Sequence, residues 1–141
     1  MKKHFVFFMV LLLLAFGSSY CFAAKGPYHK RHQQQKKESE EIGLSGKVEN
    51  GIRVIEVKAS RYKFEPDQIV VRLGEKVRLV LTTTDASHGL NIPEFKVNIS
   101  VPTGETRSVE FIADKQGEFH AHCSVYCGEG HGQMHASFVV K

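Results

Sequence analysis

The stretch KVRLVLTT (residues 76–83) has the pattern of a half-buried β-strand. Every second position is apolar, at Val77, Leu79 and Leu81, and the positions between them hold two basic residues and a valine. Successive side chains of a strand point to opposite faces, so this spacing turns one face inward and the other toward solvent. The stretch therefore predicts a strand that covers a hydrophobic core.

Short runs of similar composition lie on both sides of this strand. They are rich in Val, Ile, Leu, Phe and Thr, and turn residues such as Pro66-Asp67 and Gly74-Glu75 separate them. Their positions are 52–59, 62–64, 68–73, 95–101, 106–113, 118–122 and 134–141. No ten-residue stretch of this region has a helical period. The region 51–141 is therefore predicted to be an all-β domain, an antiparallel β-sandwich of seven to eight strands.

The first residues, 1–23, have the composition of a secretory signal peptide. A basic head precedes an unbroken apolar run at 5–16, and small residues follow it. We expect cleavage after Ala23. One alternative is an uncleaved membrane anchor, because about twenty apolar residues can cross a bilayer; another is lipid modification of Cys21. All three predict an exported protein, periplasmic or otherwise extracytoplasmic, and the two alternatives add membrane association through the N-terminal segment.

Residues 24–50 are predicted to form a disordered linker, because a stretch with so few apolar residues cannot bury enough surface to fold. The whole net charge of +4 lies before residue 51, since residues 51–141 hold eleven Lys and Arg against eleven Asp and Glu. A domain without a basic surplus is not expected to bind nucleic acid.

The segment CSVYCGEGHGQM (123–134) concentrates metal-binding side chains. Two thiols, an imidazole and a thioether lie within this one Gly-rich loop, at Cys123, Cys127, His131 and Met134. Such soft ligands suit copper better than magnesium, calcium or manganese. An isolated histidine, His88, lies upstream after Asp85, and we expect it to meet the loop at one end of the sandwich.

The cysteine pair is open to more than one interpretation. A structural disulfide is a common use of two cysteines in an exported protein, but closing so short a loop removes little chain entropy. A single copper ion would use only Cys127 and leave Cys123 as an oxidisable free thiol. Two copper ions that share both sulfurs would use every ligand. We therefore predict a binuclear copper centre, with the disulfide as the alternative.

Three stretches of the chain resemble a known family. The segments TTDASHGLNIPEF (83–95), VPTGETRSVEFIADKQGEF (101–119) and CSVYCGEGHGQM are similar to the copper A (CuA) domain of cytochrome c oxidase subunit II, which is also found in nitrous oxide reductase. The resemblance covers about residues 62–140 and includes the CxxxCxxxHxxM spacing and the upstream histidine. It implies a cupredoxin-like Greek-key sandwich with two copper ions as its cofactor.

The resemblance also implies a ligand set. The implied ligands are Cys123 and Cys127, which bridge the two ions, His131 and the backbone carbonyl of Val125 on one ion, and His88 and Met134 on the other. The family usually has Glu at position 125. The ligand there is a main-chain oxygen, so valine is expected to serve equally well.

Two departures from the family bear on function. Oxidases of this family accept electrons from cytochrome c through an exposed tryptophan, and this chain has no Trp. Their subunit II also has two transmembrane helices, where this chain has one short leader. We therefore predict a stand-alone electron carrier rather than a catalyst, with a c-type cytochrome or an oxidase subunit as its redox partner. The alternatives are a detached electron-entry subunit of a terminal oxidase or reductase, and a copper-delivery or dithiol protein.

Three histidines near the loop exceed the family's pattern, at His120, His122 and His135. We expect them to be polar residues at the rim of the metal loop, residues 123–134. The alternatives are hydrogen-bonding partners of the ligands and a transient copper-loading site.

The loop glycines and Asp85 have expected roles of their own. Gly128, Gly130 and Gly132 are expected to let a redox partner approach His131 closely. Asp85 is expected to be a turn residue before His88, and the alternative is that it holds the second N–H of the His88 ring.

Overall fold

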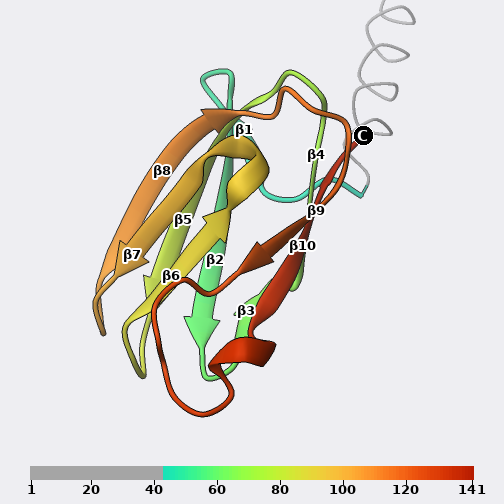
Figure 1. Cartoon of the computed structure of the whole chain (residues 1–141). Helices are drawn as coiled ribbons and strands as arrows, with labels where there is room; N and C mark the ends of the chain where they lie inside the picture. Colours follow the sequence, from blue (N-terminus) through green and yellow to red (C-terminus); the bar gives the residue numbers. More distant parts are fainter. Residues whose placement is uncertain (1–42) are drawn as a thin grey trace, which may run out of the picture. The chain divides into compact units, whose positions relative to one another are not determined.

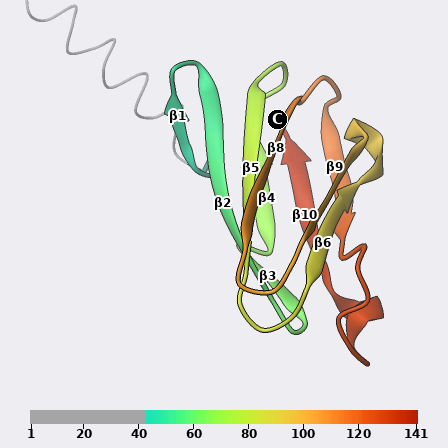
Figure 2. The same cartoon turned by 90° about the vertical axis from the view of Figure 1, so that its left-hand side faces the viewer.

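The computed structural model describes residues 43–141 as two β-sheets that face each other (Figures 1 and 2). The predicted signal peptide (1–23) and most of the predicted linker lie outside the described residues. Within residues 43–141, no helix is long and apolar enough to cross a membrane.

Ten strands and two short 3-10 helices make up the described part of the chain. In chain order they are β1 (Lys47–Glu49), β2 (Ile52–Ser60), β3 (Lys63–Glu65), β4 (Gln68–Val71), β5 (Lys76–Thr83), β6 (His88–Ile92), η1 (Pro93–Phe95), β7 (Val97–Val101), β8 (Thr106–Ile112), β9 (Gly117–His122), η2 (His131–Gln133) and β10 (His135–Val140).

Each sheet has five strands. The first has the order β1-β2-β5-β8, with β3 paired to β2, and the second has the order β4-β10-β9-β6-β7. The chain repeatedly passes from one sheet to the other, so strands far apart in sequence become neighbours. In particular β6 pairs with β9, through Asn91 and His122. This pairing brings the beginning of β6 to the same end of the sandwich as the loop between β9 and β10.

The predicted all-β sandwich is confirmed, and two details differ from the prediction. The sheets are mixed rather than purely antiparallel, because β2 runs parallel to β5 and β4 runs parallel to β10. There are also ten strands, since β1 and β6 were not predicted. A period of two in the sequence shows which face of a strand is buried, but it carries no information about the direction of the partner strand.

The core lies between the sheets and follows the alternation in the sequence. Val77, Leu79 and Leu81 of β5 are completely buried. Four aromatic rings also pack against one another there, with ring centroids 5.0 to 5.6 Å apart. They belong to Phe95, Phe111, Phe119 and Phe138. Such edge-to-face and tilted contacts stabilise beyond the area they bury. The sandwich therefore forms a rigid support for the loops at its end.

The folded part begins before the predicted boundary at residue 51. The backbone N–H of Ser45 donates to the carbonyl of Val70 at 2.8 Å, and the Ser45 hydroxyl accepts from the Val70 N–H at 2.9 Å. Residues 47–49 then pair with β2 as an edge strand. All three residues of β1 are exposed, so no apolar pattern in the sequence marks this strand.

Candidate metal centre

The loop after β9 carries two cysteines whose sulfurs face each other without a bond. The Sγ atoms of Cys123 and Cys127 lie 4.0 Å apart, and both thiols are free and buried. A disulfide has an S–S distance of about 2.05 Å. The structural disulfide that the sequence left open is therefore not formed, and two unlinked sulfurs are available as ligands.

His88 approaches this sulfur pair from β6. Its ring is completely buried, and Nδ1 lies 3.9 Å from Sγ of Cys123. The other ring nitrogen, Nε2, lies 3.0 Å from Oδ1 of Asp85. An ionised carboxylate only accepts hydrogen bonds, so Nε2 carries a proton and Nδ1 is the ring nitrogen that faces the sulfurs. Asp85 therefore orients the His88 ring, as one of the two expected roles for this residue requires.

The other predicted ligands surround the same two sulfurs. Nδ1 of His131 lies 3.7 Å from Sγ of Cys127, and Sδ of Met134 lies 3.8 Å from that sulfur. The carbonyl oxygen of Val125 lies 3.1 Å from Sγ of Cys123. The structure thus brings together all six predicted site residues, with one imidazole beside each sulfur. Potential ligand atoms of His88 and both cysteines lie within 4.8 Å of one another.

Burial and the neighbouring thiol control the protonation of Cys127. Burial raises the pKa of Cys127 to about 11, and the neighbouring Cys123 adds to this increase. The pKa of Asp85 moves the other way. The backbone N–H of Arg61 lowers it, burial opposes this effect, and the hydrogen bond with His88 lowers it further. At neutral pH the site therefore holds a protonated Cys127 thiol beside an ionised carboxylate, and a metal cation would replace the thiol proton.

The donor set fits copper. Thiolate and thioether sulfurs are soft ligands that copper(I) accepts well, and imidazole suits copper in either oxidation state. Met134 and both cysteines are nearly inaccessible to solvent, with exposed fractions of 1 to 4%. Buried sulfur and nitrogen ligands of this kind are poorly suited to magnesium or calcium, which take oxygen ligands.

Tyr62 of the β2–β3 turn packs against the glycines of the metal loop. A Cβ atom at Gly130 would lie within 2.8 Å of three atoms of the Tyr62 ring, and one at Gly128 would lie 2.5 Å from its hydroxyl oxygen. Gly128 also has φ +130°, which favours glycine. We expected these glycines to let a redox partner approach the loop closely. This expectation is wrong for Gly128 and Gly130, because Tyr62 occupies the space beside them.

Arg61 is a second residue that the sequence analysis did not associate with the site. Its Nε donates to the carbonyl of Cys127 at 2.9 Å, and its backbone N–H donates to Oδ2 of Asp85 at 2.8 Å. Arg61 thus connects the loop that carries Cys127 to the turn that orients His88. It is 66 positions away from Cys127, and no local pattern marks such a contact.

The packing of Tyr62 predicts that Gly130→Ala destabilises the loop. The added methyl group must displace the Tyr62 ring or the backbone between Cys127 and His131. We expect a loss of about 1–3 kcal/mol in the free energy of unfolding, as for overpacked sites. Urea unfolding of the metal-free protein measures it.

Gly132→Ala is the matched control, because a Cβ at Gly132 has no neighbour within 4 Å. Placing Gly130→Ala in a Tyr62→Ala background should remove most of its cost. An undiminished loss in that background would show that the clash with Tyr62 is not the cause.

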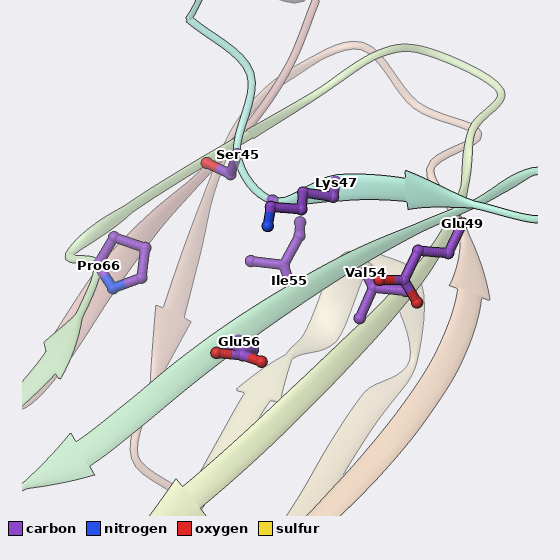
Figure 3. A pocket seen from close by; sticks show the side chains of 8 residues that line it. Ser45, Lys47, Glu49, Val54, Ile55, Glu56 and Pro66 are labelled. Atoms are coloured by element: carbon purple, nitrogen blue, oxygen red, sulfur yellow. The ribbon is translucent and has the colours of Figure 1, made fainter.

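A second concave region lies away from this site. A groove of about 360 Å³ is lined by residues of β1 and just before it, of β2 and of the segment before β4 (Figure 3), among them Ser45, Lys47, Glu49, Val54, Glu56 and Pro66. None of its lining residues is a cysteine or a histidine. The metal-binding chemistry therefore belongs to the β9–β10 loop and not to this groove.

Comparison with known proteins agrees with the fold. The cupredoxin-like domain family matches residues 9–136. The chain belongs to the cupredoxin-like domain family. This cupredoxin-like chain is 33% identical to nitrous-oxide reductase of Cupriavidus necator over 102 residues, which are 69% of this chain and 16% of that protein. It is 32% identical to cytochrome c oxidase subunit 2 of Thermus thermophilus over 85 residues, which are 60% of this chain and 63% of that protein.

The predicted resemblance to these two proteins is therefore confirmed. The chain spans less than two thirds of the length of either relative. Among solved structures, the periplasmic domain of subunit II of cytochrome oxidase from Bradyrhizobium japonicum superposes with a TM-score of 0.58. The superposition covers 62% of this cupredoxin-like chain and 83% of that one, at 21% identity, and it supports the shared fold.

Proposed function

We propose that this cupredoxin-like protein is an exported electron carrier with a binuclear copper centre of the CuA type. The observation that carries the proposal is the pair of unlinked, buried sulfurs of Cys123 and Cys127, 4.0 Å apart, with a different imidazole beside each. A mononuclear centre has no use for the second thiol. Homology to cytochrome c oxidase subunit 2 supports a carrier rather than a catalyst.

The chain's own residues would hold the centre and limit its movement. Cys123 and Cys127 would be shared by both ions, and the remaining ligands would be His131 with the Val125 carbonyl, and His88 with Met134. Copper, when bound, supplies a one-electron redox couple. The sandwich fixes the ligands through the β6–β9 pairing and through the backbone hydrogen bond from Cys123 N–H to the Met134 carbonyl, at 3.0 Å. A site that cannot rearrange needs little reorganisation when it gains or loses an electron.

The surface near His131 is where we place contact with the redox partner. Tyr126 is 74% exposed, and its ring centroid lies 5.7 Å from that of His131. An exposed aromatic ring next to a ligand offers an apolar contact and a short path to the site. We propose a c-type cytochrome or an oxidase subunit as the partner, bound transiently through this surface.

Copper analysis tests the proposal. The protein, reconstituted with copper under reducing conditions and freed of excess metal, is expected to retain two copper ions per chain, measured by elemental analysis against protein concentration. One tightly held ion per chain would contradict the binuclear assignment.

A dithiol or copper-delivery protein would use the same cysteines without needing the thioether. Sδ of Met134 lies 3.8 Å from Sγ of Cys127 and is buried, so we predict that it would be a weak ligand of copper and would adjust the redox potential. Met134→Leu should leave the copper content at two per chain and shift the reduction potential, measured by redox titration of the copper absorption. An unchanged reduction potential would show that Met134 is not a copper ligand.

Asp85 is predicted to support copper binding through His88. Asp85→Ala removes the acceptor that fixes the His88 ring and also the acceptor of the Arg61 N–H. Loss of such a supporting hydrogen bond typically lowers metal affinity about 10–100-fold. Competition with a copper(I) chelator measures the affinity. The control is Asp114→Asn at an exposed position outside the site, and equal affinities for the two variants would contradict the role of Asp85.

A further inference from the structure

Three histidines form a cluster on the outer face of the second sheet. His122 and His135 lie directly opposite each other on β9 and β10, and His120 is two positions before His122. The centroid of the His120 ring lies 5.7 Å from that of the His122 ring and 5.5 Å from that of the His135 ring. We call these three residues the outer histidine cluster.

The cluster is separate from the candidate copper centre although it adjoins it in sequence. His122 precedes Cys123, and His135 follows Met134. Since consecutive side chains of a strand point to opposite faces, the cysteine and methionine turn into the sandwich while the two histidines turn outward. Accordingly Cys123 and Met134 are buried, whereas His120 and His135 are exposed and His122 is half-buried.

Two of the three ring separations are compatible with shared coordination of one ion. Imidazole nitrogens bind zinc or copper at about 2.0–2.1 Å, which places the ring centres of two histidines on one ion roughly 5–6 Å apart. The His120–His122 and His120–His135 separations fall in this range, so rotation of these side chains about their own bonds can direct their nitrogens toward one ion. The cluster also borders an open depression of about 330 Å³, lined in part by His120 and His135, which leaves room for a metal ion and its water ligands.

Neighbouring polar groups support a cation at this position. Nδ2 of Asn91 lies 3.3 Å from Nε2 of His122. This contact restrains the orientation of the His122 ring beside the other two imidazoles. Glu118 lies on the same strand face as His120, two positions earlier, and accepts a hydrogen bond from Ser137, the residue opposite His120. Its carboxylate adds negative charge beside the rings.

We propose that the outer histidine cluster is a second metal site, which binds one divalent first-row transition ion through three imidazoles. Imidazole ligands suit copper, nickel and zinc, and affinity follows the order in which copper(II) exceeds both of the others. The site differs in chemistry from the thiolate centre, because it is exposed, contains no sulfur and takes divalent ions. It goes beyond the electron-carrier function and does not depend on it.

The test uses a chain in which other ligands have been removed. Cys123→Ser and Cys127→Ser eliminate the thiolates, and His4→Gln, His29→Gln and His32→Gln eliminate the histidines before residue 43. Zinc(II) is titrated into this chain by calorimetry, and copper(II) by electron paramagnetic resonance. We expect one ion per chain, tighter binding of copper(II) than of zinc(II), and copper(II) hyperfine structure from nitrogen ligands.

Single substitutions then assign the site. His120→Gln and His135→Gln should each weaken zinc(II) binding by more than about tenfold, and His131→Gln, the matched control on the inner centre, should not change it. Equal binding by His120→Gln and its parent, or a loss caused by His131→Gln alone, would overturn the proposal. If the double serine variant does not fold, the copper-loaded chain with intact cysteines takes its place. It should bind one further zinc(II) ion, and failure to do so would also overturn the proposal.

Discussion

Cys123→Ser is expected to reduce the copper content from two ions per chain to at most one. A serine hydroxyl stays protonated and cannot replace a thiolate that both ions share. Cys127→Ser should cause the same loss, because the two sulfurs have equivalent roles in the proposed centre. Elemental analysis after copper reconstitution and removal of excess metal measures both variants.

The comparison between the two cysteines separates a binuclear from a mononuclear centre. In a single-copper site only Cys127 would be a ligand, and Cys123→Ser would retain the full copper content of the parent. Ser124→Ala is the matched control, since Ser124 is exposed in the same loop and its hydroxyl donates to Asn98, outside the site. Full copper retention by Cys123→Ser would contradict the shared-sulfur arrangement.

Glu75→Gln is expected to cause the largest loss of stability away from the metal loop. The Arg53 side chain is completely buried, and Glu75 accepts from its Nε at 2.6 Å and its Nη2 at 2.8 Å. The Glu75 carboxylate also accepts from the backbone N–H of Arg72 at 2.9 Å. Removing the negative charge of Glu75 weakens the compensation of the buried Arg53 charge, so we expect a loss of about 3 kcal/mol in the free energy of unfolding.

The same pair predicts a dependence of stability on pH. Burial of Glu75 raises its pKa, but the hydrogen bonds from Arg53 and Arg72 outweigh this effect, and the net pKa is lowered from 4.5. A carboxyl whose pKa is lower in the folded state stabilises the fold above its unfolded pKa and loses that contribution as the pH falls through the folded value. The stability advantage of the parent over Glu75→Gln should therefore be full at neutral pH and shrink below about pH 4.5.

Urea unfolding of the parent and of Glu75→Gln at several pH values measures this effect. Glu110→Gln serves as control, since Glu110 is paired with Lys76 and Arg78 at the surface and should contribute much less. A difference between parent and Glu75→Gln that stays constant down to the lowest pH would contradict the role assigned to the Glu75 charge.

The sequence was sufficient to predict the sandwich and the composition of the candidate site. The alternation of Val77, Leu79 and Leu81 corresponds to a buried strand face. The spacing of the cysteines and of His131 identified a loop in which these side chains do converge. Both predictions rest on short-range patterns, which depend only on the geometry of a strand or of one loop.

Features that arise from long-range packing were not predictable. Strand β6 has four buried residues out of five, so it lacks the alternation by which other strands were found. The parallel pairing of β2 with β5 depends on the path of the chain between the sheets. Tyr62 covers the glycines of the metal loop from a turn far away in sequence, and it has no motif that would reveal this contact.

The electron paramagnetic resonance spectrum of the copper-loaded protein, after one-electron oxidation, tests the central claim most directly. If Cys123 and Cys127 hold two copper ions in common, the unpaired electron is shared, and the spectrum shows hyperfine splitting from two equivalent copper nuclei. A spectrum with splitting from a single copper nucleus would show that the electron is localised, and would contradict the binuclear centre.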